Sequence, residues 1–178
     1  NRMKFLSSSL LLARIRGMDI RLHFSMLVTL PITYYIFRPI DFRGIVIAFS
    51  WLLGFVLCIF LHELGHALAA KFVGVEVKGI VIWLLGGFTS LSRKAEKPIH
   101  NLFIFAAGPL VNMVLAFLCV LSYLVLSYVF LPHYRNTELF LWGQSFINLA
   151  FSLAFVNVIL VVFNLLPIYP LDGGNIMH

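Results

Sequence analysis

Long apolar segments, separated by short polar turns, are the feature that most restricts how this chain can fold. Four of them lie at about residues 22–37, 44–72, 101–131 and 139–166. Of the 178 residues, 61% are hydrophobic and 11% are charged, against about 45–50% and about 25% in soluble domains. A water-soluble core cannot hide this much apolar surface. The lipid bilayer must therefore be part of the solvent.

The lengths of these segments predict an all-α polytopic membrane protein with about four transmembrane helices. Three segments exceed the roughly 20 residues that a spanning helix needs. The first is shorter and contains Pro31, so we expect it to span only with some adjustment of the bilayer. Pro167 is expected to end the last segment. We expect residues 1–178 to form one membrane-embedded core, and Asn1 as the first residue suggests a fragment.

Two stretches have strand character and add a short membrane-associated β element to this fold class. Residues 18–22 alternate between apolar and polar side chains, which predicts an interfacial strand. Residues 79–88 are apolar and β-rich and are broken by Gly86 and Gly87. This stretch is too short to span as a helix, so it predicts a hairpin or strand buried against protein.

The distribution of Lys and Arg predicts the orientation. Five of these residues precede residue 22 and five lie in residues 71–97, whereas the other two loops hold three together. The positive-inside rule places the N-terminus and the 71–100 loop in the cytoplasm, and the tail after residue 166 falls on the same side. The net charge of +6 then indicates anionic lipid headgroups as the partner, and no nucleic acid.

A His-Glu-Leu-Gly-His motif carries the chemistry. Residues four apart on a helix share a face, so His62 and His66 can hold one metal ion together. Glu63 is offset by one residue, where it can act as a base toward a water molecule at the metal. Two imidazoles suit Zn²⁺, and a catalytic zinc site has three protein ligands and one open position. Ionisable groups within a membrane helix are costly and usually functional.

The third ligand has several candidates, of which Asp172 is favoured. The second and fourth apolar segments descend in the same direction, so His62 and Asp172 reach the same depth on the same side. His133 lies at the opposite face, and Gly173 and Gly174 provide the backbone freedom for a carboxylate to turn inward. The remaining candidates are Asp19, His100 and His178.

Several small or weakly polar residues in the apolar segments predict helix contacts. Cys58 is expected to pack rather than to bind metal. Ala106, Ala107 and Gly108 allow close helix approach. Three asparagines are each expected to form an interhelical hydrogen bond: Asn112, Asn148 and Asn157.

Taken together, these motifs resemble the site-2 protease family of intramembrane zinc metalloproteases. The His-Glu-Leu-Gly-His motif is followed about 100 residues later by the run from Asn164 to Gly174, which contains Leu-Asp-Gly-Gly. Residues 17–23, 84–87 and 106–112 also resemble stretches of that family. The resemblance covers the chain from about Gly17 onward.

The resemblance implies a zinc metalloendopeptidase that cuts transmembrane substrate proteins within or near the bilayer. It implies that His62, His66 and Asp172 bind the zinc ion and that Glu63 is the general base. It places Asn164 near the substrate, although a helix C-terminal cap is an equal alternative. The family continues into a further helix, so we expect the chain to continue beyond residue 178.

The stretch of residues 79–88 has a mechanistic use in such an enzyme. A helical substrate must unwind before its carbonyls are accessible, and its freed backbone groups need new partners in the membrane. An edge strand at Gly86 and Gly87 can supply them by strand addition.

Three other functions compete with this interpretation. Another type of membrane zinc protease uses a glutamate third ligand, but Glu76, Glu96 and Glu138 lie in loops or at the outer end of a segment. A non-catalytic relative would bind membrane helices as a scaffold. A zinc transporter would carry several polar sites along a path, whereas here they converge on one. No feature of the sequence indicates an oligomeric state.

Overall fold

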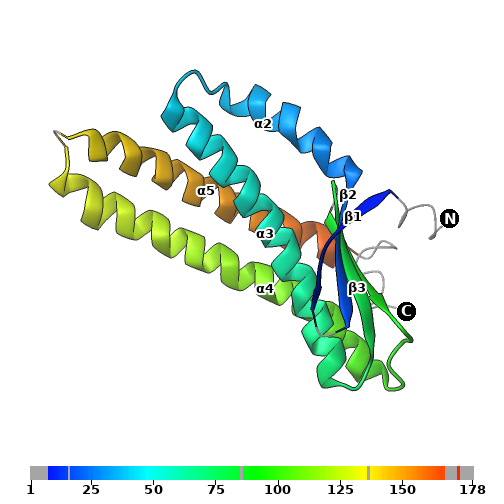
Figure 1. Cartoon of the computed structure of the whole chain (residues 1–178). Coiled ribbons are helices and arrows are strands. Elements are labelled where there is room, and N and C mark those ends of the chain that lie inside the picture. Colours follow the sequence, from blue (N-terminus) through cyan, green and yellow to red (C-terminus); the bar gives the residue numbers. More distant parts are fainter. Residues whose placement is uncertain (1–7, 16, 85, 136, 167–171, 173–178) are drawn as a thin grey trace.

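The computed structural model describes residues 8–15, 17–84, 86–135, 137–166 and 172. Three long helices cross one another, and a sheet lies beside one end of them (Figure 1). The elements in chain order are β1 (Ser9–Ile15), β2 (Met18–His23), the 3-10 helix η1 (Phe24–Val28), α2 (Thr29–Phe37), α3 (Phe42–Phe72), β3 (Val77–Trp83), β4 (Gly86–Leu91), α4 (Pro98–Val125), the π-helical η2 (Leu126–Phe130), the 3-10 helix η3 (Leu131–His133) and α5 (Glu138–Leu165).

Three of the four predicted spans are helices long and apolar enough to cross a membrane. They are α3, the continuous segment Pro98–His133 and α5. The first predicted span differs: it begins in β2 and continues as the shorter apolar helical stretch Phe24–Phe37. Leu22 pairs with Ile82 of β3, so the sheet takes up the start of that segment. Among the described residues the structure thus has three helices of spanning length.

Both ends of α3 are fixed by local hydrogen bonds. Asp41 caps the N-terminus, where its Oδ1 accepts from the Gly44 N–H at 2.7 Å. At the C-terminus Gly74 adopts a left-handed conformation with φ of +79°, and the Val75 N–H donates to the Ala70 carbonyl at 2.9 Å. This is a Schellman ending, and it turns the chain sharply into β3.

The sheet is larger than the short β element that the sequence predicts. Its order is β1-β2-β3-β4, with β2 and β3 parallel and the two outer pairs antiparallel. The strand predicted at residues 18–22 is β2, and the β-rich stretch 79–88 falls in the β3–β4 hairpin. β1 adds a fourth strand because it pairs along β2. β4 is therefore an edge strand of the described sheet.

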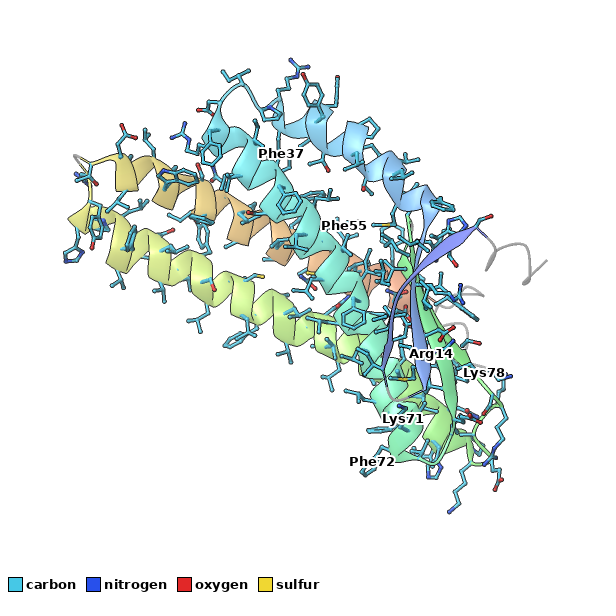
Figure 2. The ribbon with its side chains drawn as sticks, in the orientation of Figure 1. Arg14, Phe37, Phe55, Lys71, Phe72 and Lys78 are labelled. Carbon is cyan, nitrogen blue, oxygen red and sulfur yellow. The ribbon has the colours of Figure 1, made fainter. Side chains whose placement is uncertain are left out.

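The main core lies between the sheet and the end of α3 that follows residue 58. It contains Met18, Met26, Ile59, Ala67, Ala69, Ala70, Val75, Val77, Ile80, Ile82, Ala95 and Ile104. The cations Arg14, Lys71 and Lys78 lie at the same end of the molecule, around the sheet (Figure 2). The sheet thus covers one end of α3 with protein, and that end carries the His-Glu-Leu-Gly-His motif.

Candidate metal centre

The two histidines and the glutamate of the motif are buried in the structure. His62, Glu63 and His66 have relative exposures of only 4–5%. One α-helical turn separates the two imidazole side chains, whose ring centroids are 4.7 Å apart. A buried ionisable group needs a partner or a metal, so these side chains require an explanation beyond packing.

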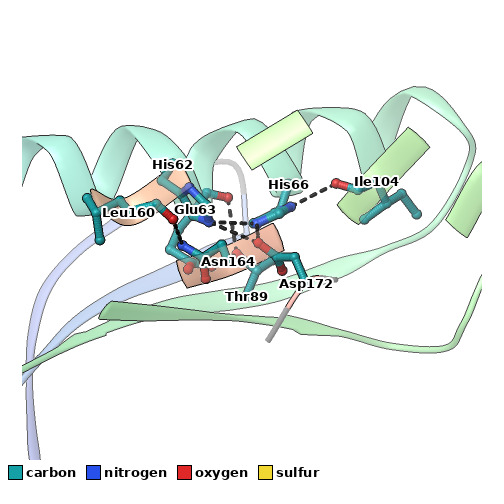
Figure 3. A network of polar contacts seen from close by, with 8 residues as sticks. All are labelled: His62, Glu63, His66, Thr89, Ile104, Leu160, Asn164 and Asp172. Carbon is teal, nitrogen blue, oxygen red and sulfur yellow. Dashed lines mark hydrogen bonds and ion pairs between the residues drawn. The ribbon is translucent and has the colours of Figure 1, made fainter. Parts of the chain in front are cut away.

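Asp172 completes a group of three ligand atoms with the two histidines (Figure 3). Its Oδ2 lies 3.2 Å from His62 Nε2 and 3.1 Å from His66 Nε2, and the two Nε2 atoms are 3.0 Å apart. Asp172 follows 106 residues after His66 in the chain, yet its carboxylate reaches the same point. The structure therefore brings together the three residues predicted as metal ligands.

The spacing of these three atoms fits a small tetrahedral metal ion such as zinc. Zinc bonds of about 2.0–2.1 Å to nitrogen and oxygen put tetrahedral ligand atoms about 3.3 Å apart. The three separations here are 3.0–3.2 Å. Two imidazoles and one carboxylate are also a donor set that zinc favours in proteins, and they leave a fourth position open.

The backbone of α4 orients one of the imidazoles. His66 Nδ1 lies 2.7 Å from the Ile104 carbonyl oxygen, which can only accept a hydrogen bond. The His66 ring therefore carries a hydrogen on Nδ1, and Nε2, on the side of His62 and Asp172, is the nitrogen available to a metal. Metal-binding histidines are commonly held in this way by a carbonyl acceptor behind the ring.

Gly108 of α4 provides the space for both imidazoles. A Cβ atom at this position would lie 2.3 Å from His66 Nε2 and 2.7 Å from His62 Nε2, closer than atoms can pack. Gly65 is similarly tight, since its Cβ would lie 3.0 Å from the Ala107 carbonyl oxygen. Of the small residues predicted to allow close helix approach, Gly108 makes room at the ligand atoms themselves, and Ala107 lies at the close contact with Gly65.

Strand β4 holds the glutamate of the motif. The Thr89 hydroxyl lies 2.6 Å from Glu63 Oε2 and 3.1 Å from the Glu63 backbone carbonyl. A Cβ at Gly87 would lie 2.1 Å from Glu63 Cγ, so only glycine fits beside this side chain. Gly86 has φ of +145°, a conformation that L side chains rarely adopt. The two glycines of the hairpin are thus required by close approach and by backbone shape.

Asn164 lies in the last turn of α5, near the three ligand residues (Figure 3). Its Nδ2 donates to the Leu160 carbonyl of its own helix at 2.9 Å, which leaves Oδ1 outside that bond. The structure does not test the predicted contact of Asn164 with substrate. Its hydrogen bond is compatible with the alternative role in the C-terminal turn.

The other candidate ligands are not part of this group in the described portion of the chain. Asp19 is bound by Arg14 at 2.7 Å, and His133 Nδ1 contacts the Val129 carbonyl at the far end of α4. His100 lies in the first turn of α4 and joins no described metal group. Pro167, Gly173, Gly174 and His178, to which the sequence analysis gave roles, lie outside the described residues.

Sequence reasoning missed two contacts at the site, those of Thr89 and the Ile104 carbonyl. Thr89 follows the glycine pair by two positions, but nothing in its sequence context points to a glutamate 26 residues earlier. A backbone carbonyl carries no residue identity at all. Helix-to-helix register would have been needed to find Ile104.

Comparisons with known proteins agree with this geometry. The profile of Peptidase family M50 matches residues 50–137 and 133–178. The chain is 38% identical over 133 residues to the protein sll0528 of Synechocystis sp., covering 71% of this chain and 31% of that protein. It is 31% identical over 170 residues to a zinc metalloprotease of Methanocaldococcus jannaschii, covering 96% of this chain and 44% of the relative.

A solved structure has the same fold. The site-2 protease from Methanocaldococcus jannaschii superposes with a TM-score of 0.66 at 28% identity, covering 95% of this chain and 69% of that one. The chain spans 31–44% of the length of the curated relatives it matches. The family profile covers more than half of the chain and includes both parts of the site. The chain therefore belongs to Peptidase family M50.

Proposed function

We propose that residues 1–178 form the membrane-embedded core of a zinc metalloprotease that hydrolyses peptide bonds of transmembrane proteins. One observation carries this proposal: two buried histidines on the apolar helix α3 and the carboxylate of Asp172 bring three ligand atoms within 3.0–3.2 Å of one another, next to a glutamate held by Thr89. The family and its zinc metalloprotease member in Methanocaldococcus jannaschii support it. The substrate class follows from the site lying on apolar helices.

In this proposal His62, His66 and Asp172 hold the zinc ion and Glu63 is the general base. Zinc supplies a Lewis acid that activates water and polarises the scissile carbonyl. Glu63 takes the proton from the attacking water and passes it to the leaving amine. The Thr89 hydroxyl donates to Oε2 of Glu63 and so restrains the carboxylate of the proposed base.

β4 is proposed to bind the substrate backbone. β4 is an edge strand of the described sheet and begins with Gly86 and Gly87, of which Gly87 lies beside Glu63. A substrate segment that unwinds at the site can pair with this edge, which satisfies its freed backbone groups within the membrane. Asn164, in the last turn of α5, is proposed to contact the same segment.

The proposed membrane arrangement has four spans, with α2 and η1 forming a short first crossing. The N-terminus, the sheet and the metal centre then lie on the cytoplasmic side. Ten of the thirteen Lys and Arg residues precede residue 22 or fall in residues 71–97, which supports this orientation. A site at that depth has a short path for water from the cytoplasm.

The replacement Glu63→Gln tests the function. Cleavage of a single-span substrate in proteoliposomes is expected to fall about 10²–10⁴-fold, because general-base assistance is removed. Bound zinc, measured by mass spectrometry of metals, should stay near one per chain. Removal of zinc with a chelator should abolish cleavage, and added zinc should restore it.

The matched control is Glu96→Gln. This carboxylate is exposed and pairs with Arg93 in the loop before α4, away from the metal ligands. Its loss should leave the cleavage rate within about twofold of the wild type, since exposed ion pairs contribute little to stability. Equal cleavage by Glu63→Gln and the wild type would remove Glu63 from the mechanism. Zinc binding without cleavage of any transmembrane substrate would favour a non-catalytic scaffold.

A further inference from the structure

A second buried polar group lies one helical turn from the metal centre, between α3, α4 and α5. Five buried side-chain nitrogen and oxygen atoms of the described residues have no hydrogen-bond partner. Four of these belong to three residues: Nδ1 of His62, Nδ2 and Oδ1 of Asn112, and Oδ1 of Asn157. Both asparagines are completely buried. Unpaired polar atoms cost most in a dry interior, so their concentration in one place calls for a cause.

The register of α3 against α4 puts Asn112 beside His62. The two helices run antiparallel (Figure 1). Ile104 contacts His66, and four residues further along α4 Gly108 lies against both His66 and His62. Advancing one more turn on both helices pairs Asn112 with Cys58. The asparagine thus lies one turn from the His62 imidazole, on the face of α4 that meets α3.

The directions of the two side chains bring them closer still. In an α-helix the Cα–Cβ bond tilts toward the helix N-terminus. The Asn112 side chain therefore leans back toward Gly108, which has no side chain to obstruct it. The His62 side chain leans toward Cys58, because α3 runs the opposite way. This tilt directs the carboxamide and the imidazole toward the space between these two levels.

Asn157 of α5 is the third member of this buried polar group. Its Nδ2 donates to Cys58 Sγ at 3.1 Å and to the Leu153 carbonyl at 2.8 Å. Both contacts hold the carboxamide in one orientation at the level of Cys58. The Oδ1 atom is left as an acceptor within the same three-helix junction.

Metal binding by His62 makes this group of acceptors useful. A histidine that binds a metal through Nε2 carries its hydrogen on Nδ1, and that N–H needs an acceptor to fix the ring. The Ile104 carbonyl serves His66 in this way. For His62 the described structure offers no direct acceptor, but amide oxygens of the two asparagines lie in the same junction. One internal water has the two to four polar partners it requires there.

We propose that Asn112 is a positioning residue for His62, acting through an internal water that accepts the Nδ1 hydrogen of His62 and donates to Asn112 Oδ1. Asn157 Oδ1 accepts the second hydrogen of this water. The water site fixes the tautomer and ring angle of His62, and so the affinity for zinc. This inference rests on the proposed function only in taking zinc as the metal.

The test is zinc affinity, measured by chelator competition on the whole protein in lipid nanodiscs. Asn112→Leu keeps the size of the side chain and removes both polar atoms, and its zinc affinity should fall about 10–100-fold, as for other residues that orient metal ligands. Asn112→Asp retains the acceptor oxygen and should bind zinc at least as tightly as the wild type. Ile147→Ala, a buried α5 position, should lower the unfolding temperature and leave zinc affinity unchanged.

A second measurement detects the Nδ1 hydrogen of His62 by NMR. In protein with ¹⁵N-labelled histidine, His62 should show an Nδ1–H resonance protected from solvent exchange, assigned by its loss in His62→Gln. This resonance should disappear in Asn112→Leu and persist in Ile147→Ala. Wild-type zinc affinity in Asn112→Leu, or a loss matched by Ile147→Ala at equal destabilisation, would overturn the inference. If the wild type binds no zinc, the proposed function fails, and the protected resonance alone decides for or against the role of Asn112.

Discussion

The two ends of the three-helix bundle differ in where their polar groups form hydrogen bonds. At the site end, near the sheet, several of these bonds join different elements: His66 to α4, Thr89 to α3, and Asn157 to Cys58. Asn164 bonds within its own helix there. At the far end, near η3, these bonds return to the same helix. Ser122 donates to Leu118 and Ser145 to Leu141.

The far end also has an apolar cavity. A cavity of about 440 Å³ opens between α4, η2 and α5, and its lining is almost entirely apolar. Lipid tails are as apolar as the side chains that line it, so little drives these helices together there. Close contacts in a membrane depend on small residues and cross-element polar bonds. The comparison indicates that hydrogen bonds between different elements, rather than apolar surface, identify the functional part of this helix bundle.

The largest expected difference between the two ends comes from replacing one glycine by alanine at each of them. Gly108→Ala should abolish zinc binding and reduce cleavage by about 100-fold or more, because the new Cβ would overlap both imidazoles. Gly143→Ala places a Cβ 2.9 Å from the tip of Leu131, a flexible side chain that can move. It should leave zinc binding and cleavage within about twofold, and helix propensity even favours it. Equal losses from the two variants would contradict the comparison.

A smaller difference in activity between the two ends is expected when one hydroxyl group is removed at each of them. Thr89→Val deletes the donor to Glu63 Oε2, and we expect kcat to fall about tenfold through a less well-held base, with zinc content unchanged. Thr89→Ser should restore most of the activity. The matched change Ser122→Ala removes a bond within α4 and should alter neither quantity. An unchanged kcat in Thr89→Val would limit Thr89 to a structural contact.

The smallest effect is expected at the ion pairs that Asp19 of β2 forms on the surface of the sheet. Hydrogen bonds from Arg14, then Arg21, lower the pKa of the Asp19 carboxyl below its ordinary value. A lowered pKa in the folded state stabilises above the ordinary carboxyl value, and the gain is lost as the pH falls through the folded value. Asp19→Asn should slightly lower the unfolding temperature at pH 7, less so in high salt. The difference from the wild type should vanish in acid, and a difference that persists there would argue against the ion pairs.

Much of the architecture was predictable because membrane helices carry strong local signals. The three long helices begin and end within a few residues of the predicted apolar segments, since hydropathy alone selects them. The first predicted span was less successful. Its opening residues pair with β3, and strand pairing with a distant segment leaves little trace in local hydropathy.

The site shows the same contrast between what local sequence patterns predict and what contacts between distant segments add. That His62 and His66 share a helix face follows from their spacing of four residues alone. Shared depth made Asp172 the favoured third ligand, and the structure brings its carboxylate to both imidazoles. Packing between elements, by contrast, sets which carbonyl orients His66 and which hydroxyl holds Glu63. It also explains why Gly87 and Gly108 must lack side chains. Helical periodicity is a property of neighbouring residues, whereas contacts between elements depend on how whole helices and strands pack.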